Sequence, residues 1–260
     1  MKTKKQKAIA ATCAVAFWLL VWHVVSLCVG SELVLVSPVK VVQTLFTVIF
    51  DPDFLKTVWY SAARILGGFF TALTLGTVLG WVASRFWVVE TLLRPITAVI
   101  KATPVASFII LVLLWFSGKN LSVIISMLMV FPVIYMNVLE GIRSADKKLL
   151  EMAQVFRLSV SKKLLYIYLP AVAPFFVSAC SVSLGLCWKS GIAAEVIGTP
   201  DGSIGAVFYQ AKIFLQTSEL LAWTVVVVAV SVAFEKLFML LLRLILKKLK
   251  MEDVLNGKRA

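Results

Sequence analysis

Long apolar segments are the feature that most limits how this chain can fold. A helix that crosses a membrane needs about 20 mostly apolar residues, and six segments approach or exceed this length: 8–29, 58–83, 96–116, 121–141, 170–187 and 220–240. Apolar residues make up 61% of the 260 residues and charged residues only 15%, whereas a soluble domain must present far more polar surface to water. The sequence therefore predicts an all-α, polytopic membrane protein, with six transmembrane helices in a single domain over residues 1–260.

Two of these segments have unusual features. The first follows a basic start, as a signal peptide does, but it is longer than the apolar core of a signal peptide, so we expect a retained first helix. The third is interrupted early by Lys101 and Pro104, and we still expect it to cross as one span. Between the first two spans, Ser37 and Pro38 predict the start of a short amphipathic helix.

The distribution of basic residues predicts the orientation. With the amino terminus inside, the cytoplasmic segments contain 18 Lys and Arg residues and the opposite side contains five, leaving out those within or at the ends of spans. Cytoplasmic loops of membrane proteins are enriched in Lys and Arg. We therefore expect both termini and the loop 142–169 to be cytoplasmic. The net charge of +13 comes mainly from basic residues that flank the spans. Because this placement is explained by orientation in the membrane, we expect no nucleic-acid partner.

Small residues recur every four positions in the second span. They are Gly68, Ala72, Gly76 and Gly80, and this spacing places them on one helix face, where small residues let two membrane helices approach closely. The pattern fits either fixed helix packing or an interface that moves during activity, and the sequence does not separate the two.

The loop between the fourth and fifth spans is long, basic and helical in pattern. The spacing of its apolar residues predicts an amphipathic helix through Leu149, Leu150, Ala153 and Phe156. A serine-containing interruption follows, and a second helix then leads back to the membrane. A short helix outside the membrane, with an apolar face and flanking charges, is suited to docking into a groove on a partner.

The sequence of this loop, EMAQVFRLSVSKKLLYIYLP, resembles the EAA loop of ABC-transporter permeases. Five positions keep both the residue and the spacing of that pattern: Glu151, Ala153, Ile167, Leu169 and Pro170. Met152 replaces an alanine and Arg157 replaces the glycine. The resemblance implies that an ATPase couples to this chain through Glu151, Ala153, Arg157, Leu158, Ile167, Leu169 and Pro170.

The arginine at the glycine position has two interpretations. A glycine there would suit a turn with positive φ. We expect the turn to take a different shape in this chain, with φ of Arg157 remaining negative, because a surface loop can change shape at little cost. The alternative is a strained turn in which the guanidinium pairs with a carboxylate on the ATPase.

Other stretches extend the resemblance to most of the chain. The residues Ser37-Pro38, Pro104 and the sequence WKSGIAAEVIG at 188–198 resemble permeases of nitrate-, sulfonate- and taurine-type importers. The resemblance implies a type I ABC importer permease fold in the cytoplasmic (inner) membrane of a prokaryote. It also implies a homodimer, two separate ATP-binding subunits and an extracytoplasmic substrate-binding protein. The implied substrate is a small anion such as a sulfonate or nitrate, or a vitamin or pyrimidine precursor.

Polar residues in and after the fifth span are candidates for the pathway or its gate. The four candidates are Lys189, Glu195, Ser178 and Ser181. The first two follow the predicted span on the outer side, where they could instead form a structural ion pair, and the serines could instead serve helix packing. Glu235 and Lys236, late in the sixth span, are expected to reach the cytoplasmic headgroups.

The sequence contains no catalytic constellation that we can identify. Gly118-Lys119 is followed by Asn120 and lacks the earlier glycine of a phosphate loop, so we expect ATP and Mg to be used by the partner ATPase and no cofactor to be bound here. The only histidine, His23, has no second histidine with which to share a metal. Two other classes remain as alternatives: a secondary transporter driven by an ion gradient, and a membrane-embedded enzyme.

Overall fold

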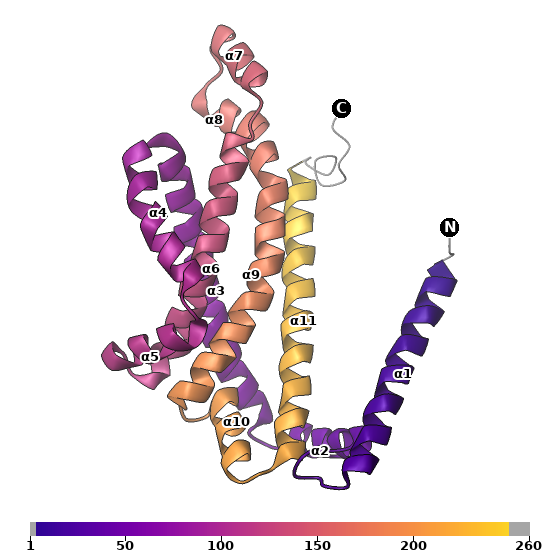
Figure 1. Ribbon diagram of the computed structural model, residues 1–260. Coiled ribbons are helices and arrows are strands. Elements are labelled where there is room, and N and C mark those ends of the chain that lie inside the picture. The colour runs from indigo at the N-terminus through magenta and orange to yellow at the C-terminus, as the bar shows by residue number, and fades with distance from the viewer. Residues whose placement is uncertain (1–3, 250–260) are drawn as a thin grey trace.

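The computed structural model describes residues 4–249, and every regular element in this range is helical (Figure 1). In chain order the elements are α1 Lys4–Val29, α2 Pro38–Ile49, α3 Phe54–Arg85, α4 Trp87–Ala102, α5 Val105–Trp115, α6 Gly118–Arg143, α7 Lys147–Val155, α8 Val160–Lys163, the π-helical turn η1 Leu164–Tyr168, α9 Leu169–Gly198, α10 Ile204–Ile213 and α11 Thr217–Lys248. Four basic residues counted for the orientation, Lys2, Lys250, Lys258 and Arg259, lie outside the described residues.

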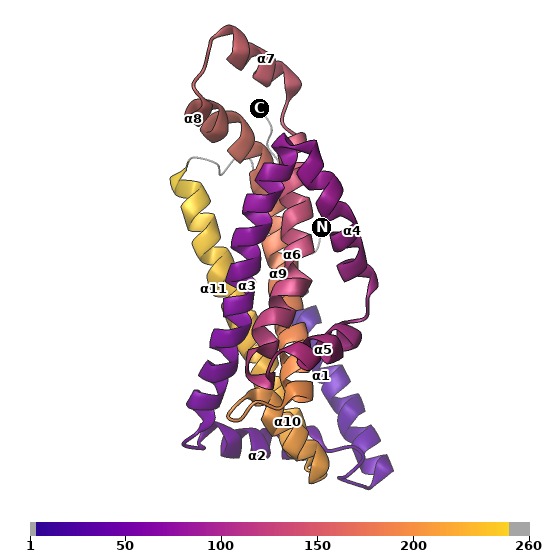
Figure 2. The same ribbon diagram turned by 90° about the vertical axis from the view of Figure 1, so that its left-hand side faces the viewer.

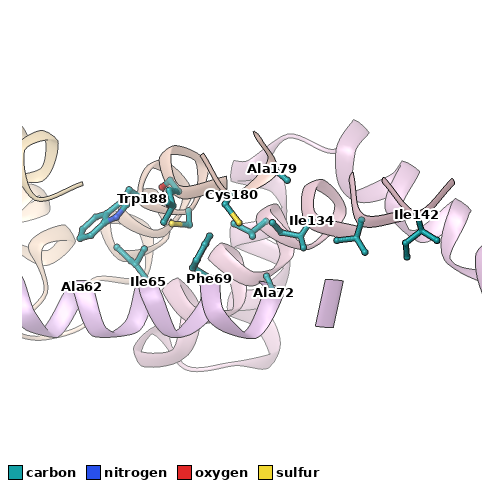
Figure 3. Packing of buried hydrophobic residues seen from close by; sticks show 13 residues of the cluster. Ala62, Ile65, Phe69, Ala72, Ile134, Ile142, Ala179, Cys180 and Trp188 are labelled. Carbon is teal, nitrogen blue, oxygen red and sulfur yellow. Dashed lines mark hydrogen bonds between the residues drawn. The ribbon is translucent and has the colours of Figure 1, made fainter. Parts of the chain in front are cut away.

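Three long helices, α3, α6 and α9, form the centre of the molecule, and α11 runs beside α9 (Figures 1 and 2). Their main core is a continuous cluster that includes Ile65 and Phe69 from α3, Ile134 from α6, and Cys180 and Trp188 from α9 (Figure 3). Each of these side chains is almost completely buried. The core is therefore built from the faces of the spans that meet one another, and the remaining faces stay apolar and exposed.

Five helices in the described range are long and apolar enough to cross a membrane, and α4 with α5 makes a sixth if the two count as one span. These two helices are bent by 110° relative to each other, so the interruption expected within the segment 96–116 divides it between two helices. The break falls at Thr103, which is extended (φ −82°, ψ 132°) and precedes Pro104. Proline removes a backbone donor and disfavours helical geometry in the residue before it.

The fifth span is longer than predicted. Helix α9 continues eleven residues past the predicted end at 187 and stops at Thr199, which has positive φ (38°). Lys189 and Glu195 therefore lie on the helix and not in a connection after it. The extension is helical because its small and apolar residues keep helical spacing and are buried against neighbouring helices; the buried set is Trp188, Ser190, Gly191, Ala194 and Glu195.

Helix α1 stands apart from the other spans and joins them through α2 (Figure 1). The predicted start of α2 is confirmed: the Ser37 side chain caps the helix by accepting a hydrogen bond from the Lys40 amide at 3.3 Å, and Pro38 occupies the first turn. Trp22 of α1 donates from Nε1 to the Val36 carbonyl at 3.0 Å. This contact fixes the corner between the two helices.

Candidate functional site

Helices α7 and α8 project beyond the ends of the spans (Figures 1 and 2). Helix α7 begins at Asp146, whose side chain accepts from the Lys148 amide at 2.8 Å. On the side toward the spans, Ala153 is fully buried and packs with Ala145 and Ile167. We refer to this pair of helices with its connecting turn, residues 147–163, as the projecting loop.

The tip of the projecting loop is apolar and exposed. Val155 and Val160 are each 79% exposed, and Phe156 is 71% exposed. The same small segment thus holds a buried anchor at Ala153 and an uncovered apolar tip. Clustered apolar side chains outside a membrane mark a surface that contacts another molecule.

The turn between α7 and α8 does not have the shape that we expected. Arg157 has φ +52°, so the prediction of a negative φ is wrong. The Arg157 amide donates to the Gln154 carbonyl at 3.0 Å, and the Leu158 amide donates to the Ala153 carbonyl at 2.9 Å. These two bonds form a Schellman motif, in which the residue with positive φ is most often glycine. The arginine thus keeps the backbone geometry that the glycine of the EAA pattern would supply.

The other residues of the EAA-like pattern divide into exposed and buried groups. Glu151 is exposed on α7, whereas Leu158 and Ile167 pack beside Ala153. Leu169 and Pro170 directly follow the π-helical turn η1 within one run of helical backbone from Val160 to Gly198. The Leu169 amide donates to the Leu164 carbonyl as in a π turn, next to the position where Pro170 has no amide to donate. The buried members fix how the loop is attached to the spans, and the exposed ones remain available to a partner.

At the opposite end of the molecule, Glu195 is a fully buried carboxylate. Its Oε2 accepts hydrogen bonds from Ser61 Oγ at 2.6 Å and from the Gly205 amide at 3.4 Å. The Ser61 hydroxyl in turn accepts from the Ile204 amide at 2.9 Å. These amides begin α10, so the carboxylate lies at the positive end of that helix and joins it to α3 and α9.

Arg64 lies close to the Glu195 carboxylate. It follows Ser61 by three residues, on the same face of α3. Its Nη2 donates to Asn120 Oδ1 at 3.1 Å, and its guanidinium carbon lies 4.8 Å from the centre of the Tyr60 ring. Arg64 and Ser122 are both within electrostatic range of Glu195. The arrangement is a polar contact between α3, α6, α9 and α10 at the end of the bundle away from the projecting loop.

The four candidate pathway residues are not brought together. Lys189 is exposed on α9 and forms no ion pair with Glu195. Ser178 is also exposed, and Ser181 donates from Oγ to Glu235 Oε1 on α11 at 3.0 Å. The sequence interpretation missed Ser61 as the partner of Glu195, since these residues are 134 positions apart. It also missed the contact of Glu235 with α9, for which a carboxylate inside an apolar span was the available signal.

The small residues of α3 face α6 at very short range. A Cβ atom added at Gly68 would lie 2.4 Å from the Val123 carbonyl oxygen, and one at Gly76 would lie 3.0 Å from Ile134 Cβ. A Cβ at Gly80 would lie 3.0 Å from Val138 Cγ1, and Ala72 between them is fully buried. The absence of larger side chains along this face is what allows the two backbones to lie so close.

The described helices form a multi-pass membrane protein with a short helical hairpin outside the spans. Residues 72–251 match the family of binding-protein-dependent transport system inner membrane components. The chain belongs to this family.

Individual relatives agree with this assignment. A Bacillus subtilis protein described as an aliphatic sulfonates transport permease is 30% identical over 230 residues, covering 87% of this chain and 83% of that protein. The taurine transport system permease protein of Escherichia coli is 27% identical over 220 residues, covering 82% and 80%. The nitrate import permease protein of Synechocystis is 26% identical over 214 residues, covering 78% and 76%.

The fold also has a solved counterpart. A chain of an amino acid ABC transporter, crystallised with histidines, superposes with a TM-score of 0.53 over 75% of this chain and 96% of its own. The two sequences are 16% identical, so this likeness concerns the fold alone.

Proposed function

We propose that this chain is the membrane-spanning subunit of an ATP-driven importer for a small anion. In this proposal two copies form the translocation pathway, and two separate ATP-binding subunits dock on the projecting loops. An extracytoplasmic binding protein delivers the substrate. ATP and Mg are bound by the ATPase and not by this chain, and the complex lies in the cytoplasmic membrane of a prokaryote.

The projecting loop is the observation that carries the proposal. Its exposed tip at Val155, Phe156 and Val160 lies outside the spans, where no lipid chain would cover it. Exposed apolar area of this kind is stabilised when a partner removes it from water, at about 25 cal/mol per Å². Because Ala153 is buried against the spans on the other side, a force applied at the tip would be transmitted to α9.

The charge distribution supports the orientation. Helices α3, α6 and α11 each have basic residues in their last turn: Arg85, Arg143, and Lys247 with Lys248. All three ends lie on the side of the molecule from which α7 and α8 project (Figure 1). By the positive-inside rule this side is cytoplasmic, which would place the Glu195 cluster at the outer end and both termini inside.

The relatives support the substrate class. Those reported above are named for aliphatic sulfonates, taurine and nitrate, and each of these compounds carries an oxyanion group. We extend this shared chemistry to the present chain and propose a sulfonate, nitrate or related small oxyanion. A vitamin or pyrimidine precursor is the second candidate.

Two phenylalanines allow a matched test of docking. Phe156 is 71% exposed and caps the end of α7, and Phe214 is 70% exposed and caps the end of α10. In each case the next residue has positive φ, 52° at Arg157 and 55° at Leu215. The two positions therefore share residue type, exposure and local backbone, and they differ in lying at opposite ends of the molecule.

The experiment measures how much ATP-binding subunit co-purifies with the tagged permease from detergent-solubilised membranes. Phe156→Asp is expected to lose most of the ATPase, because the substitution places a charge in the apolar contact. Phe214→Asp is expected to retain it. Equal retention in both variants would remove the projecting loop from its proposed role.

A further inference from the structure

A second polar feature lies between the spans, away from the Glu195 cluster. A cavity of about 440 Å³, open on one side, lies along α11 next to Ser181 of α9, and its other lining residues are Glu235, Lys236, Met239, Leu240 and Arg243. The side chains of Lys236, Leu240 and Arg243 are exposed at its open side. Pockets that hold small ligands occupy about 300–1,000 Å³. The cavity is therefore large enough for a small organic anion.

The charges in this cavity are not balanced by the protein. It contains two cations, Lys236 and Arg243, and one carboxylate, Glu235. None of the three forms an ion pair within residues 4–249. The one hydrogen bond to the carboxylate is donated by the neutral hydroxyl of Ser181 at 3.0 Å. The cavity thus has a net positive charge, although α11, which supplies most of its lining, is apolar over much of its length.

Glu235 and Lys236 lie within the predicted sixth span, 220–240, and Lys236 is about 6 Å along the helix axis from the inner end of that span. A lysine side chain can cover this distance by extending toward the interface, but Glu235 is held toward α9 by its hydrogen bond from Ser181. Ionisable groups at such positions are rare, and nearly all face the bundle interior or a water-filled cavity.

We propose that the cavity between α9 and α11 is a transient binding subsite for the transported oxyanion. Lys236 and Arg243 supply the positive charge that attracts it, and Glu235, oriented by Ser181, keeps the binding weak. Weak binding is required because a conducted ion must leave as readily as it enters. The two cations lie seven residues apart on one face of α11, so the anion can pass from Lys236 to Arg243 toward the basic end of the helix.

This inference rests on the proposed function and goes further by assigning residues to the substrate. The same chemistry could be offered by the phosphate of a lipid headgroup, so the experiment must separate a dissolved oxyanion from a lipid. It must also be independent of ATPase docking. Reaction of an introduced cysteine with charged reagents satisfies both conditions.

The reporter is Leu240→Cys, which lines the cavity and keeps both cations. Its control is Leu241→Cys, the next residue along the helix and outside the cavity lining. The two leucines are 55% and 51% exposed. Cys13 and Cys28, which are exposed, are replaced by serine, and the buried Cys180 and Cys187 are kept. The complete transporter is placed in phospholipid vesicles with reagent on both sides.

Two methanethiosulfonate reagents are compared, one carrying a sulfonate and one carrying a trimethylammonium group. Each rate is divided by the rate of the same reagent with a small free thiol in solution. On this scale we expect Leu240→Cys to react with both reagents and to favour the sulfonate about tenfold, because a nearby charge changes the local reagent concentration by this order. The ratio of the two rates cancels the thiolate fraction of the cysteine. Adding Lys236→Gln or Arg243→Gln should reduce the preference, and methanesulfonate should slow the reaction. Leu241→Cys should react with neither reagent.

Three results would overturn the inference. The first is no reaction at Leu240→Cys, or equal reaction at Leu241→Cys, which would mean that the cavity is not open to water. The second is reaction without a preference for the anionic reagent. The third is a labelling rate at Leu240→Cys that is unchanged by methanesulfonate but changes when phosphatidylglycerol is replaced by phosphatidylcholine. This result would identify a lipid site. Failure here with normal ATPase co-purification would leave the proposed function intact.

Discussion

The close contact between α3 and α6 predicts very different effects for alanine at two adjacent glycines. At Gly68 a Cβ atom would lie 2.4 Å from the Val123 carbonyl oxygen and 2.8 Å from Ser126 Cβ, whereas at Gly67 it would meet nothing within 4 Å. Both substitutions change the intrinsic helix propensity by the same amount, about 1 kcal/mol in favour of alanine. The difference between them therefore isolates the clash.

The magnitude follows from the displacement that the clash requires. A carbon atom normally stays about 3.3 Å or more from a carbonyl oxygen, so α3 and α6 must separate locally by nearly 1 Å. A gap of 0.5–1 Å forfeits about a quarter to a half of each affected contact. Overpacking of this kind typically destabilises by about 1–3 kcal/mol. We expect Gly68→Ala to be less stable than Gly67→Ala by this amount, which is about 5- to 150-fold in the opening equilibrium.

Two buried cysteines provide the assay. Cys180 and Cys187 lie on α9, and both are fully buried in the cluster that contains Phe69 of α3. Figure 3 shows Cys180 and Phe69 in this cluster. With Cys13 and Cys28 replaced by serine, the rate of maleimide labelling in detergent measures how often this cluster opens, provided that closing is faster than labelling. Gly68→Ala should be labelled faster than the parent, and Gly67→Ala at the same rate or more slowly.

Equal labelling of the two variants, with transport unchanged in both, would refute the close approach of α3 and α6. Gly76→Ala and Gly80→Ala add a graded check, because the atoms nearest to their Cβ atoms would lie at 3.0 Å and not at the 2.4 Å of Gly68. Their effect should fall between those of Gly67→Ala and Gly68→Ala. If Gly68→Ala leaves labelling unchanged but abolishes transport, the stripe is an interface that moves and not a fixed contact.

Three further predictions concern the proposed function. Single cysteines at Lys119 and Lys162, in a background without native cysteines, should label from opposite sides of the membrane with an impermeant thiol reagent, and labelling of both from outside would contradict the orientation. The purified chain alone should hydrolyse no ATP above a mock preparation, because the sequence has no phosphate loop. Glu195→Gln keeps the side-chain volume and one acceptor oxygen for Ser61 and Gly205, so the variant should retain the ATPase. Its uptake should fall, because the negative charge at the start of α10 is lost. Wild-type uptake would mean that Glu195 has only a structural role.

The spans were the part of the fold that the sequence predicted best, because their length is set by the thickness of the membrane and not by tertiary contacts. The start of α2 was also predictable, since Ser37 and Pro38 act through bonds within the first turn. The interruption of the third span near Pro104 was predicted, but the size of the bend was not. Pro104 indicates a break, but the 110° angle depends on what α5 packs against, which includes α6 and α9.

The candidate site was predictable only where its interactions are local. The projecting loop follows from its own apolar spacing, whereas the role of Glu195 depends on Ser61 and on the amide of Gly205, which belong to other helices. The end of α9 was placed too early because polar and small residues after Cys187 looked like a connection. Their buried positions repeat with helical spacing, and this periodicity was the signal that would have extended the helix.

The turn at Arg157 holds a non-glycine residue in a strained conformation. We expected the loop to avoid positive φ, yet the residue adopts φ +52°, a conformation that costs a non-glycine residue about 1–2 kcal/mol. Arg157 is exposed and has no ion pair within the described part of the chain. No carboxylate among residues 4–249 offsets the strain by pairing with the guanidinium, and we propose a carboxylate on the ATPase as its partner.

Arg157→Gly separates strain from pairing, and Leu215→Gly is the matched control because Leu215 has φ +55° in an equivalent turn at the end of α10. Both substitutions should stabilise their turns, so the amides that close them, Leu158 to Ala153 and Gln216 to Ala211, should exchange hydrogen about 5- to 30-fold more slowly. Only Arg157→Gly should lose ATPase during purification, because only it removes a guanidinium from the docking surface. If Arg157→Gly slows exchange and keeps or gains ATPase, the arginine makes no pair there, and the turn geometry alone is what the loop requires.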